Sequence, residues 1–346
     1  MVAPSTQAIQ RVRQRQLQIK RITVMKNIIE NQQQSESPEI CIMNLPWLYR
    51  VLQISHQQLS TRKVQYRATL FHDKATLTVS WIQHQADARL MTGCLVSPRW
   101  ISNTVCEHGQ ILINRLLLVT SPSLVNVFET VPHEWVADRS LINDAKMLVD
   151  LLPDYFMRLL SGIFINHKRF YRFLVGPSSL NGHHNNQHGN LRHSIDVTRN
   201  ALLNGQDRAT VSNAVLVMAA LLHDAGKADE YMFNHQRNRF EISTRGALLG
   251  HKISIVEWVA AAVAQYQIQI PQHEYLSLMH ALTAVKGAPD WVGIREAMSP
   301  EAHLLSIADR LSGHEDLFAQ TRPANQGFGQ YHKHLKGRPY LVASRQ

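Results

Sequence analysis

Polar and apolar residues alternate along two stretches in the first third of the chain. The alternation covers residues 64–70, and it returns over residues 75–81 after the turn-like sequence His72-Asp-Lys74. A period of two predicts half-buried β-strands. Residues 94–96 and 111–119 are apolar runs of strand length. We therefore expect a strand-rich domain over residues 39–125, and several short strands in about eighty residues suit a small β-barrel such as an OB-fold.

Helical periodicity replaces the strand pattern from Pro132 onward. Apolar residues recur three and four positions apart, as they do on the buried face of a helix. The predicted helices cover residues 138–151, 191–204, 209–224, 245–266, 273–285 and 300–318, and residues 159–173 mix aromatic with basic side chains. The expected fold class is α+β with two domains, a small OB-like β-barrel followed by an all-α helical bundle over residues 126–318.

The two ends of the chain differ from these domains. Residues 1–38 interleave apolar residues with Arg and Lys and close with a Gln-, Ser- and Pro-rich stretch, which predicts a basic arm and a linker. An amphipathic helix on a phosphate backbone and a plain solvated helix both fit this arm. Residues 319–346 contain Gly, Pro, Arg and Lys, and we expect a loosely attached basic tail.

The composition limits where the protein works and what it binds. The 346 residues carry a formal net charge of +10, which favours polyanionic partners such as nucleic acid. No apolar run approaches the length of a membrane span, and no secretory segment begins the chain. The three cysteines lack metal-type spacing, as expected for reduced thiols. We therefore expect a cytoplasmic protein with no membrane partner.

Residues 214–227 carry the most informative chemistry. They form a predicted buried helix that ends in His223 and Asp224, followed by Gly226 as a helix stop and by Lys227. An ionisable pair at the inner end of a buried helix is costly unless something compensates it. A bound cation supplies that compensation. The alternative is that His223 bonds a backbone carbonyl and Asp224 caps the next turn.

Further histidines and an aspartate surround this pair at regular spacing. His193 precedes it, and His251, His280 and Asp309 follow it, each in or beside an apolar helical run. The steps are about thirty residues, the length of one helix and its connection. Successive helices would then each direct one ligand to a shared centre. Imidazole nitrogen and carboxylate oxygen suit zinc, manganese or iron better than calcium.

The predicted barrel also offers side chains for nucleic acid. Tyr66 and Trp81, if exposed, would stack on the bases of a single strand, and Arg67 and Arg99 would neutralise its phosphates. Aromatic residues in a small barrel also form cores. The sequence pattern is compatible with both roles.

With this series of ligands in view, the chain resembles the HD-domain metal-dependent phosphohydrolase superfamily. The resemblance lies in His183-His-Asn-Asn-Gln-His-Gly-Asn-Leu-Arg-His193, Leu222-His-Asp-Ala-Gly-Lys227, Leu248-Leu-Gly-His251 and Glu301-Ala-His-Leu-Leu-Ser-Ile-Ala-Asp309. A strand-rich module before such a domain is most similar to the YhaM-like 3′→5′ exoribonucleases, which join an OB-fold to an HD domain. The HH…H, HD-x-GK and Ala308-Asp-Arg-Leu-Ser312 segments also resemble the HD domain of TraI-type conjugative relaxases.

The resemblance implies a site for one or two divalent ions (Mn, Fe, Zn or Mg). His193, His223, Asp224 and Asp309 would hold the first ion, and His251 and His280 would hold the second, with Asp224 as a bridge. Two-metal members carry a His-His pair before a glycine in the fourth segment, where this chain reads Val285-Lys-Gly287. The sequence therefore leaves open whether a second ion binds. Lys286 would place an ammonium near the position of that ion.

Asp224 and Lys227 are the residues that we expect to act in catalysis, with Lys227 neutralising phosphate. A solvated cation at a helix end is the alternative for Lys227. The expected substrate-binding residues are His183, His184, Arg192 and Lys286. Loop residues beside a polar site also serve structural roles, so the pattern alone does not decide between the two.

Three functions fit these observations. The first is a metal-dependent phosphodiesterase or 3′→5′ exonuclease acting on single-stranded RNA or DNA, which the predicted barrel and the positive charge favour. The second is a nucleotide phosphohydrolase or cyclic-nucleotide phosphodiesterase, which needs neither feature. The third is a non-catalytic nucleic-acid-binding or conjugation protein with a partly decayed site, which Val285 and Lys286 favour. The oligomeric state does not follow from the sequence.

Overall fold

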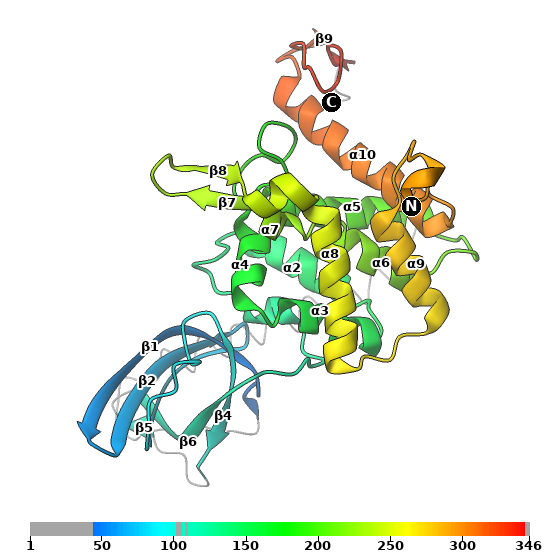
Figure 1. Ribbon diagram of the computed structural model, residues 1–346. Coiled ribbons are helices and arrows are strands. Elements are labelled where there is room, and N and C mark those ends of the chain that lie inside the picture. The colour runs from blue at the N-terminus through cyan, green and yellow to red at the C-terminus, as the bar shows by residue number, and fades with distance from the viewer. Residues whose placement is uncertain (1–43, 102–105, 108–109, 343–346) are drawn as a thin grey trace, which may run out of the picture.

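The computed structural model describes residues 44–101, 106–107 and 110–342, and the predicted arm of residues 1–38 lies outside them. A sheet forms the N-terminal part of the described chain, and helices form most of the rest (Figure 1). The predicted mixed α+β class is therefore confirmed, with a strand-rich part before a helical part.

The N-terminal sheet closes through strands that are far apart in sequence. Its strand order is β3-β2-β1-β4-β6-β5, and a further parallel pairing joins β3 to β6. Five strands, β3, β2, β1, β4 and β6, are therefore joined in a closed cycle of hydrogen-bonded pairs. The strands are β1 (Tyr49–Ser60), β2 (Lys63–His72), β3 (Ala75–Gln83), β4 (Leu95–Trp100), β5 (Cys106–Glu107) and β6 (Gln110–Leu118).

Four of these strands follow the predicted runs, whereas β1 does not. β2 and β3 pair in antiparallel register from Val64–Gln83 to His72–Ala75, around the predicted turn at residues 73–74. β1 was missed because its residues do not alternate: Tyr49 to Val51 are all buried, and residues 55–60 are all exposed. A period of two is visible only where one face is buried and the other is solvated.

The predicted exposure of two barrel aromatics is wrong. Tyr66 is 2% exposed and Trp81 is 3% exposed, and their rings stack with centroids 4.8 Å apart. The Tyr66 hydroxyl accepts the backbone N–H of Asp87 at 2.9 Å, and the Trp81 indole donates to Gln83 at 3.0 Å. Both rings belong to the apolar core of the sheet, so they are not available to stack on bases.

Helices and two short strand pairs make up the remainder. Their bounds are η3 (Val127–Thr130), α2 (Arg139–Val149), α3 (Asp154–Phe164), α4 (His167–Val175), α5 (Gly189–Gly205), α6 (Asn213–Leu222), α7 (Lys227–Glu230), β7 (Tyr231–Asn234), β8 (Arg239–Ile242), α8 (Thr244–Tyr266), α9 (Gln272–Thr283), η4 (Asp290–Val292), α10 (Pro300–Thr321), β9 (Gly327–Phe328) and β10 (Tyr340–Leu341). One apolar core joins these helices, and α6 lies inside it, buried from Val215 to Leu222.

Side-chain caps explain where several helices begin. The Asn166 side chain accepts the backbone N–H of Arg169 at 3.1 Å, so the mixed segment of residues 159–173 divides into α3 and α4. Ser212 caps α6 in the same way, three residues later than the predicted start of that helix. The β7–β8 hairpin was not predicted, because each of its strands is only four residues long.

The C-terminal segment holds more structure than the expected loose tail. α10 continues to Thr321, and the strands β9 and β10 then pair through Phe328 and Tyr340. The backbone N–H of Gln330 donates to the carbonyl of Thr321 at 3.0 Å. Residues 327–341 therefore fold back as a short hairpin beyond the end of α10 (Figure 1).

Among the described residues, α8 has the length and composition of a membrane-crossing helix, contrary to the expectation that no apolar run approaches that length. Its backbone is not continuous, because Gly250 has φ 68° and ψ 177° and bends the helix near its start. The segment after the bend packs against α3 and α9. These contacts fit a helix at the edge of a helical core.

A single arginine ties the sheet to the helices. Arg50 of β1 has no exposed surface, and it donates to Gly93 O at 2.7 Å, Thr130 O at 3.0 Å and Thr130 Oγ1 at 2.8 Å. Its guanidinium lies 4.8 Å from the centroid of the Trp135 ring and 5.1 Å from that of Phe170. Burial lowers the pKa of Arg50 to about 9. The cation is thus held by carbonyls and ring faces.

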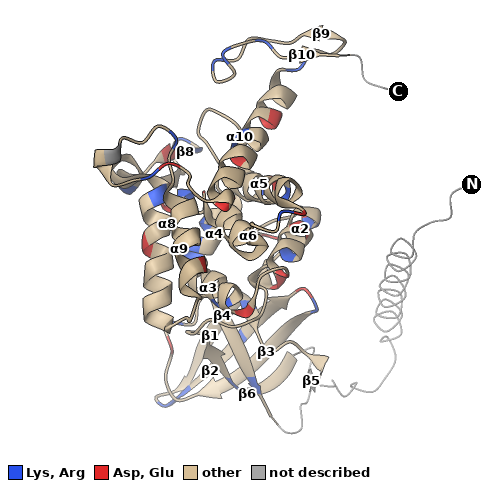
Figure 2. Ribbon diagram, turned by 90° about the vertical axis from the view of Figure 1, so that its right-hand side faces the viewer, with Lys and Arg blue, Asp and Glu red and all other residues tan. Residues whose placement is uncertain are grey.

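A second contact between the two parts is ionic. Asp73, in the turn between β2 and β3, pairs with Arg139 at 2.7 Å and Lys146 at 2.5 Å, both on α2. The backbone N–H of Asp73 donates to Glu129 O at 2.8 Å. Figure 2 shows the sheet packed against the helical part. The two contacts fix the orientation of the sheet relative to the helices.

We expect Arg50→Ala to lower the free energy of unfolding by about 3 kcal/mol or more, because it leaves buried acceptors at Gly93 and Thr130 without a donor. Urea denaturation followed by circular dichroism measures this change. The matched control is Arg67→Ala, an exposed arginine on β2, which should change the value by less than about 0.5 kcal/mol. Equal stability of both variants would contradict the role of Arg50.

Candidate metal centre

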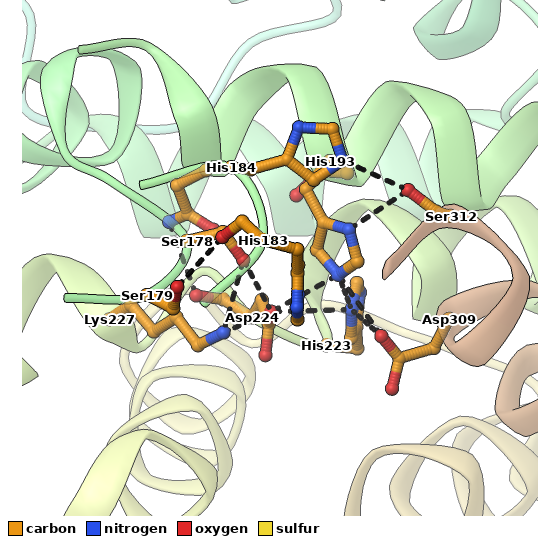
Figure 3. A network of polar contacts seen from close by, with 12 residues as sticks. Ser178, Ser179, His183, His184, His193, His223, Asp224, Lys227, Asp309 and Ser312 are labelled. Carbon is orange, nitrogen blue, oxygen red and sulfur yellow. Dashed lines mark hydrogen bonds and ion pairs between the residues drawn. The ribbon is translucent and has the colours of Figure 1, made fainter. Parts of the chain in front are cut away.

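Three helices bring four of the predicted ligands together (Figure 3). His193 lies on α5, Asp309 lies on α10, and His223 follows the last residue of α6, with Asp224 next in the chain. α6 packs against both α5 and α10. The end of this buried helix therefore delivers His223 and Asp224 between the other two ligands.

The four side chains approach one another through single atoms. His193 Nε2 lies 3.3 Å from His223 Nε2, 3.4 Å from Asp224 Oδ2 and 3.0 Å from Asp309 Oδ1. His223 Nε2 lies 3.5 Å from Asp224 Oδ2 and 3.8 Å from Asp309 Oδ1. Ligands bonded to one ion at about 2.0–2.2 Å lie about 3.0–3.5 Å from each other. Donor types and spacing therefore fit a divalent ion.

Hydrogen bonds on the far side of each imidazole select the nitrogen that faces the centre. His223 Nδ1 lies 2.8 Å from the carbonyl oxygen of Ala220 and donates its proton there. His193 Nδ1 lies 3.1 Å from Ser312 Oγ. With Nδ1 as the donor, each Nε2 keeps a lone pair, as a metal ligand must.

The electrostatics of the cluster favour positive charge between its carboxylates. Burial acts to raise the pKa of Asp224, yet Lys227 and His223 hold it well below its usual value. Burial also acts to raise the pKa of Asp309, yet the adjacent His193 and His223 imidazoles hold it below its usual value. Both carboxylates are therefore ionised, and a divalent cation is a counter-charge that suits such a set.

One side of the cluster faces the solvent. The side chain of Asp309 is 44% exposed, compared with 7% for Asp224 and 0% for His193. An ion held by these residues could thus be reached from the Asp309 side. Open coordination on one side distinguishes a catalytic metal site from a closed structural one.

Lys227 is part of the cluster and not a solvated helix end. Its side chain is 10% exposed, and Nζ lies 2.5 Å from Asp224 Oδ2 and 3.2 Å from Ser178 Oγ. The backbone between Asp224 and Lys227 is tightly placed, because a Cβ on Gly226 would lie 2.1 Å from the carbonyl oxygen of His251. Gly226 is thus needed for this close approach, and α6 already ends at Leu222, before the predicted glycine stop.

His251 lies on the opposite oxygen of the same aspartate. Its Nε2 is 3.3 Å from Asp224 Oδ1, and its Nδ1 is 2.6 Å from Glu230 Oε2. This is the geometry of a residue whose free nitrogen faces a bridging carboxylate, with Glu230 fixing the tautomer. The structure therefore places His251 beside Asp224, as the resemblance implies, though outside the group of four.

The other two residues expected at a second ion lie elsewhere. His280 Nε2 accepts the backbone N–H of Met298 at 2.8 Å, and Lys286 is exposed. Besides Lys227, a second lysine that sequence reasoning missed, Lys252, interacts electrostatically with the carboxylates. Lys252 donates to the carbonyls of Leu282 and Ala284 at 3.3 and 3.4 Å. Burial lowers its pKa, whereas Asp224 and Asp309 raise it, so Lys252 lies within electrostatic reach of both.

The loop before α5 places the two predicted histidines differently. His183 Nε2 is buried without a hydrogen-bond partner, and its ring centroid lies 4.9 Å from that of His193. Burial lowers the pKa of His183 to about 4. His184 supports the scaffold, since its backbone N–H donates to Asp316 at 2.7 Å and its Nε2 lies 3.3 Å from Ser312 Oγ. His183 thus has a nitrogen free for a ligand.

The remaining predicted binding residues lie away from the cluster. Arg192 is exposed and pairs with Asp138 at 3.4 Å, whereas its neighbour His193 is buried. Arg67 and Arg99 are exposed on β2 and β4 of the sheet. These three arginines remain available to phosphate groups, but none has a described contact with the four ligands.

A family model described as the HD domain matches residues 190–313, a span that begins just before His193 and ends just after Ser312. The part of the chain that carries the four ligand candidates is therefore similar to the HD domain. Among curated proteins it is similar to the 3′-5′ exoribonuclease YhaM of Bacillus licheniformis, with 28% identity over 139 residues. It is likewise similar to the 3′-5′ exoribonuclease YhaM of Bacillus subtilis, with 26% identity over 148 residues.

These similarities cover part of each protein. The matched regions are 40% and 43% of this chain, and 43% and 46% of the two relatives. The chain thus spans less than half the length of either relative. No solved structure matches the chain.

We expect Ser312→Ala to weaken Mn²⁺ binding by about 10- to 100-fold, because it removes the hydroxyl that orients His193. Isothermal titration of chelator-treated protein with MnCl₂ measures the dissociation constant. The matched control is Ser306→Ala, on the same helix and without a described contact to the cluster, which should bind like the unaltered chain. Unchanged affinity of the Ser312 variant would exclude this orienting role.

Proposed function

We propose that this protein is a metal-dependent phosphodiesterase that removes nucleotides from the 3′ end of single-stranded nucleic acid. The observation that carries the proposal is that His193, His223 and Asp224 lie 3.3–3.5 Å from one another, with Asp309 3.0 Å from His193 and 3.8 Å from His223. The similarity to two proteins named 3′-5′ exoribonuclease supports the polymer and the direction. The net charge of +10 supports a polyanionic substrate.

A divalent ion at this centre would supply a bound water of lowered pKa and a positive charge beside a phosphoryl oxygen. The residues that would hold it are His193, His223, Asp224 and Asp309. The exposed side of Asp309 is where the scissile phosphate would approach. His183, with its unpartnered Nε2, would face the same phosphate or the leaving oxygen.

Two lysines would balance the charge of the phosphate. Lys227 is fixed against Asp224 and Ser178, and Lys252 is fixed by two carbonyl oxygens. Ammonium groups that are held in place before the substrate arrives stabilise developing negative charge without reorganisation. Asp224 thus has two roles in this proposal, as a ligand and as the anchor of Lys227.

We propose that the strand-rich part is an OB-fold that guides a single strand to the helical part. The closed order β1-β2-β3-β6-β4, with β3 and β6 parallel, is compatible with a five-stranded Greek-key barrel. Arg67 and Arg99 would contact the phosphates. The domain boundaries that we propose are residues 39–125 and 126–318, between a basic arm and a basic tail, in a protein of the cytoplasm.

We expect one firmly bound ion per chain. A second ion beside Asp224 Oδ1 would find one other described protein ligand, His251 Nε2, because His280 bonds Met298. Two protein ligands hold an ion more weakly than four. Elemental analysis of Mn²⁺-loaded protein after gel filtration should give about one ion per chain, and His251→Ala should keep it. Two retained ions would contradict the single-ion proposal.

Asp224→Asn should slow hydrolysis of single-stranded RNA by more than about 100-fold, because loss of a residue that merely orients a ligand already costs 10- to 100-fold. Protein with Mn²⁺ is incubated with 5′-labelled and 3′-labelled oligonucleotides of RNA and DNA. A 5′ label should give a ladder that shortens stepwise, and a 3′ label should leave at once as a mononucleotide. Gel-shift affinity of the variant should stay within about threefold.

The control for this variant is Asp154→Asn, an exposed carboxylate at the start of α3, which should cleave normally. Turnover of free or cyclic nucleotides without a ladder would favour the nucleotide phosphohydrolase or cyclic-nucleotide phosphodiesterase. Binding of strands by the Mn²⁺-loaded unaltered chain without any cleavage would favour a non-catalytic role. Full activity of Asp224→Asn would exclude the proposed centre.

A further inference from the structure

The β7–β8 hairpin presents two aromatic rings on one face. Phe233 of β7 and Phe240 of β8 are directly opposite in the antiparallel register, with ring centroids 5.1 Å apart. Phe233 is 38% exposed, and its neighbour Met232 is 54% exposed. A two-stranded hairpin gains stability by burying such a pair, so rings left open to solvent require another explanation.

A cavity of about 650 Å³ lies between this hairpin and the body of the helical part. Phe233 and Phe240 line it together with Tyr171 and Tyr231. A second cavity of about 720 Å³, lined by the loop of residues 177–185, shares the same two phenylalanines. The two rings therefore stand between two adjacent hollows of a size that holds small organic ligands.

The first cavity borders the metal centre. Lys227 is one of its lining residues, and Lys227 Nζ lies 2.5 Å from Asp224 Oδ2. Arg172 and His235 also line this cavity, and Arg239 lines the second. One end of a molecule in the first cavity would thus lie beside Lys227, next to Asp224. Its other end would lie among the aromatic rings.

This combination is the chemistry of a nucleotide subsite. Base–aromatic stacking accepts every base because every base has a π face, and cations beside the platform track the phosphates. Two amide side chains that line the same cavity, Gln187 and Asn238, are exposed and can reach base or sugar edges. Each of these cations keeps a carboxylate partner, Lys227 with Asp224, Arg172 with Asp229 and Arg239 with Glu241, and the mixture of rings, amides and cations suits a nucleotide better than an apolar peptide.

We propose that the Phe233–Phe240 platform on the β7–β8 hairpin stacks the base of the 3′-terminal nucleotide and thereby places its phosphodiester bond at the metal centre. This inference rests on the proposed function and assigns it a substrate subsite. Because stacking carries the contact, the subsite tolerates all four bases. It requires a base at the terminal position.

The test uses a single-stranded RNA that carries 2-aminopurine, whose fluorescence is quenched by stacking, either at its 3′ terminus or five positions inward. Binding is measured with chelator-treated full-length protein, so that no strand is cleaved. The terminal probe should be quenched on binding, and the inward probe should change less. Phe233→Leu, which keeps the apolar bulk and removes the ring, should abolish the terminal quenching and weaken binding about tenfold.

Two further variants complete the experiment. Phe233→Tyr should restore the quenching, since it restores the ring. Phe318→Ala removes an exposed aromatic on α10 that lines neither cavity, and it should bind and quench like the unaltered chain. Quenching by Phe233→Leu equal to that of the unaltered chain, or equal quenching of both probe positions, would overturn the subsite.

The readout separates this inference from the proposed function. Terminal quenching by an unaltered chain that fails to cleave RNA with Mn²⁺ would support the subsite and exclude the nuclease. Cleavage of the 3′-terminal nucleotide without terminal quenching would support the nuclease and exclude the subsite. A strand with an abasic 3′ terminus gives a kinetic check, because its kcat/KM should fall when the base no longer places the bond at the metal centre.

Discussion

The structure depends on the electrostatics of two carboxylates and two imidazoles packed against one another at the inner end of a buried helix. Asp224 and His193 are almost without solvent contact, so their charges cannot be stabilised by water. Two lysines beside this group, Lys227 and Lys252, compensate part of the negative charge of the carboxylates. His193 and His223 lie within 3.0–3.8 Å of both carboxylates, and such an arrangement suits one more positive charge between the two aspartates. A divalent ion satisfies this constraint, and it explains why ionisable residues occupy the middle of an apolar core.

The fold serves this constraint through a few local features. α6 is apolar on every side because it is surrounded, and its end is therefore the deepest place to which a helix can deliver a ligand. Gly226 then lets the chain pass the backbone of His251 at a distance that no side chain would allow. Ser312 and the carbonyl of Ala220 turn the imidazoles so that Nε2 faces inward. Each feature acts on the geometry of the four ligands.

The sequence contained enough information to predict that geometry in outline but not its surroundings. The spacing pattern pointed to six residues, including His251 and His280, and the resemblance selected His193, His223, Asp224 and Asp309 among them. Lys252 was missed because its proximity to Asp224 arises only when α8 packs against its neighbours. The predicted exposure of Tyr66 and Trp81 ran against the alternation itself, because they share the apolar strand faces of Val64 and Val79, and those faces are buried. The β7–β8 hairpin escaped prediction because strands of four residues carry too few positions to show a period.

The central claim is that one divalent ion binds among His193, His223, Asp224 and Asp309. Anomalous diffraction at the manganese edge from a crystal soaked in MnCl₂ tests it most directly. The account predicts a single strong peak about 2.0–2.2 Å from His193 Nε2, His223 Nε2 and the nearer oxygens of both aspartates. A peak at another position, or four side chains that turn away from each other with no peak between them, would contradict it.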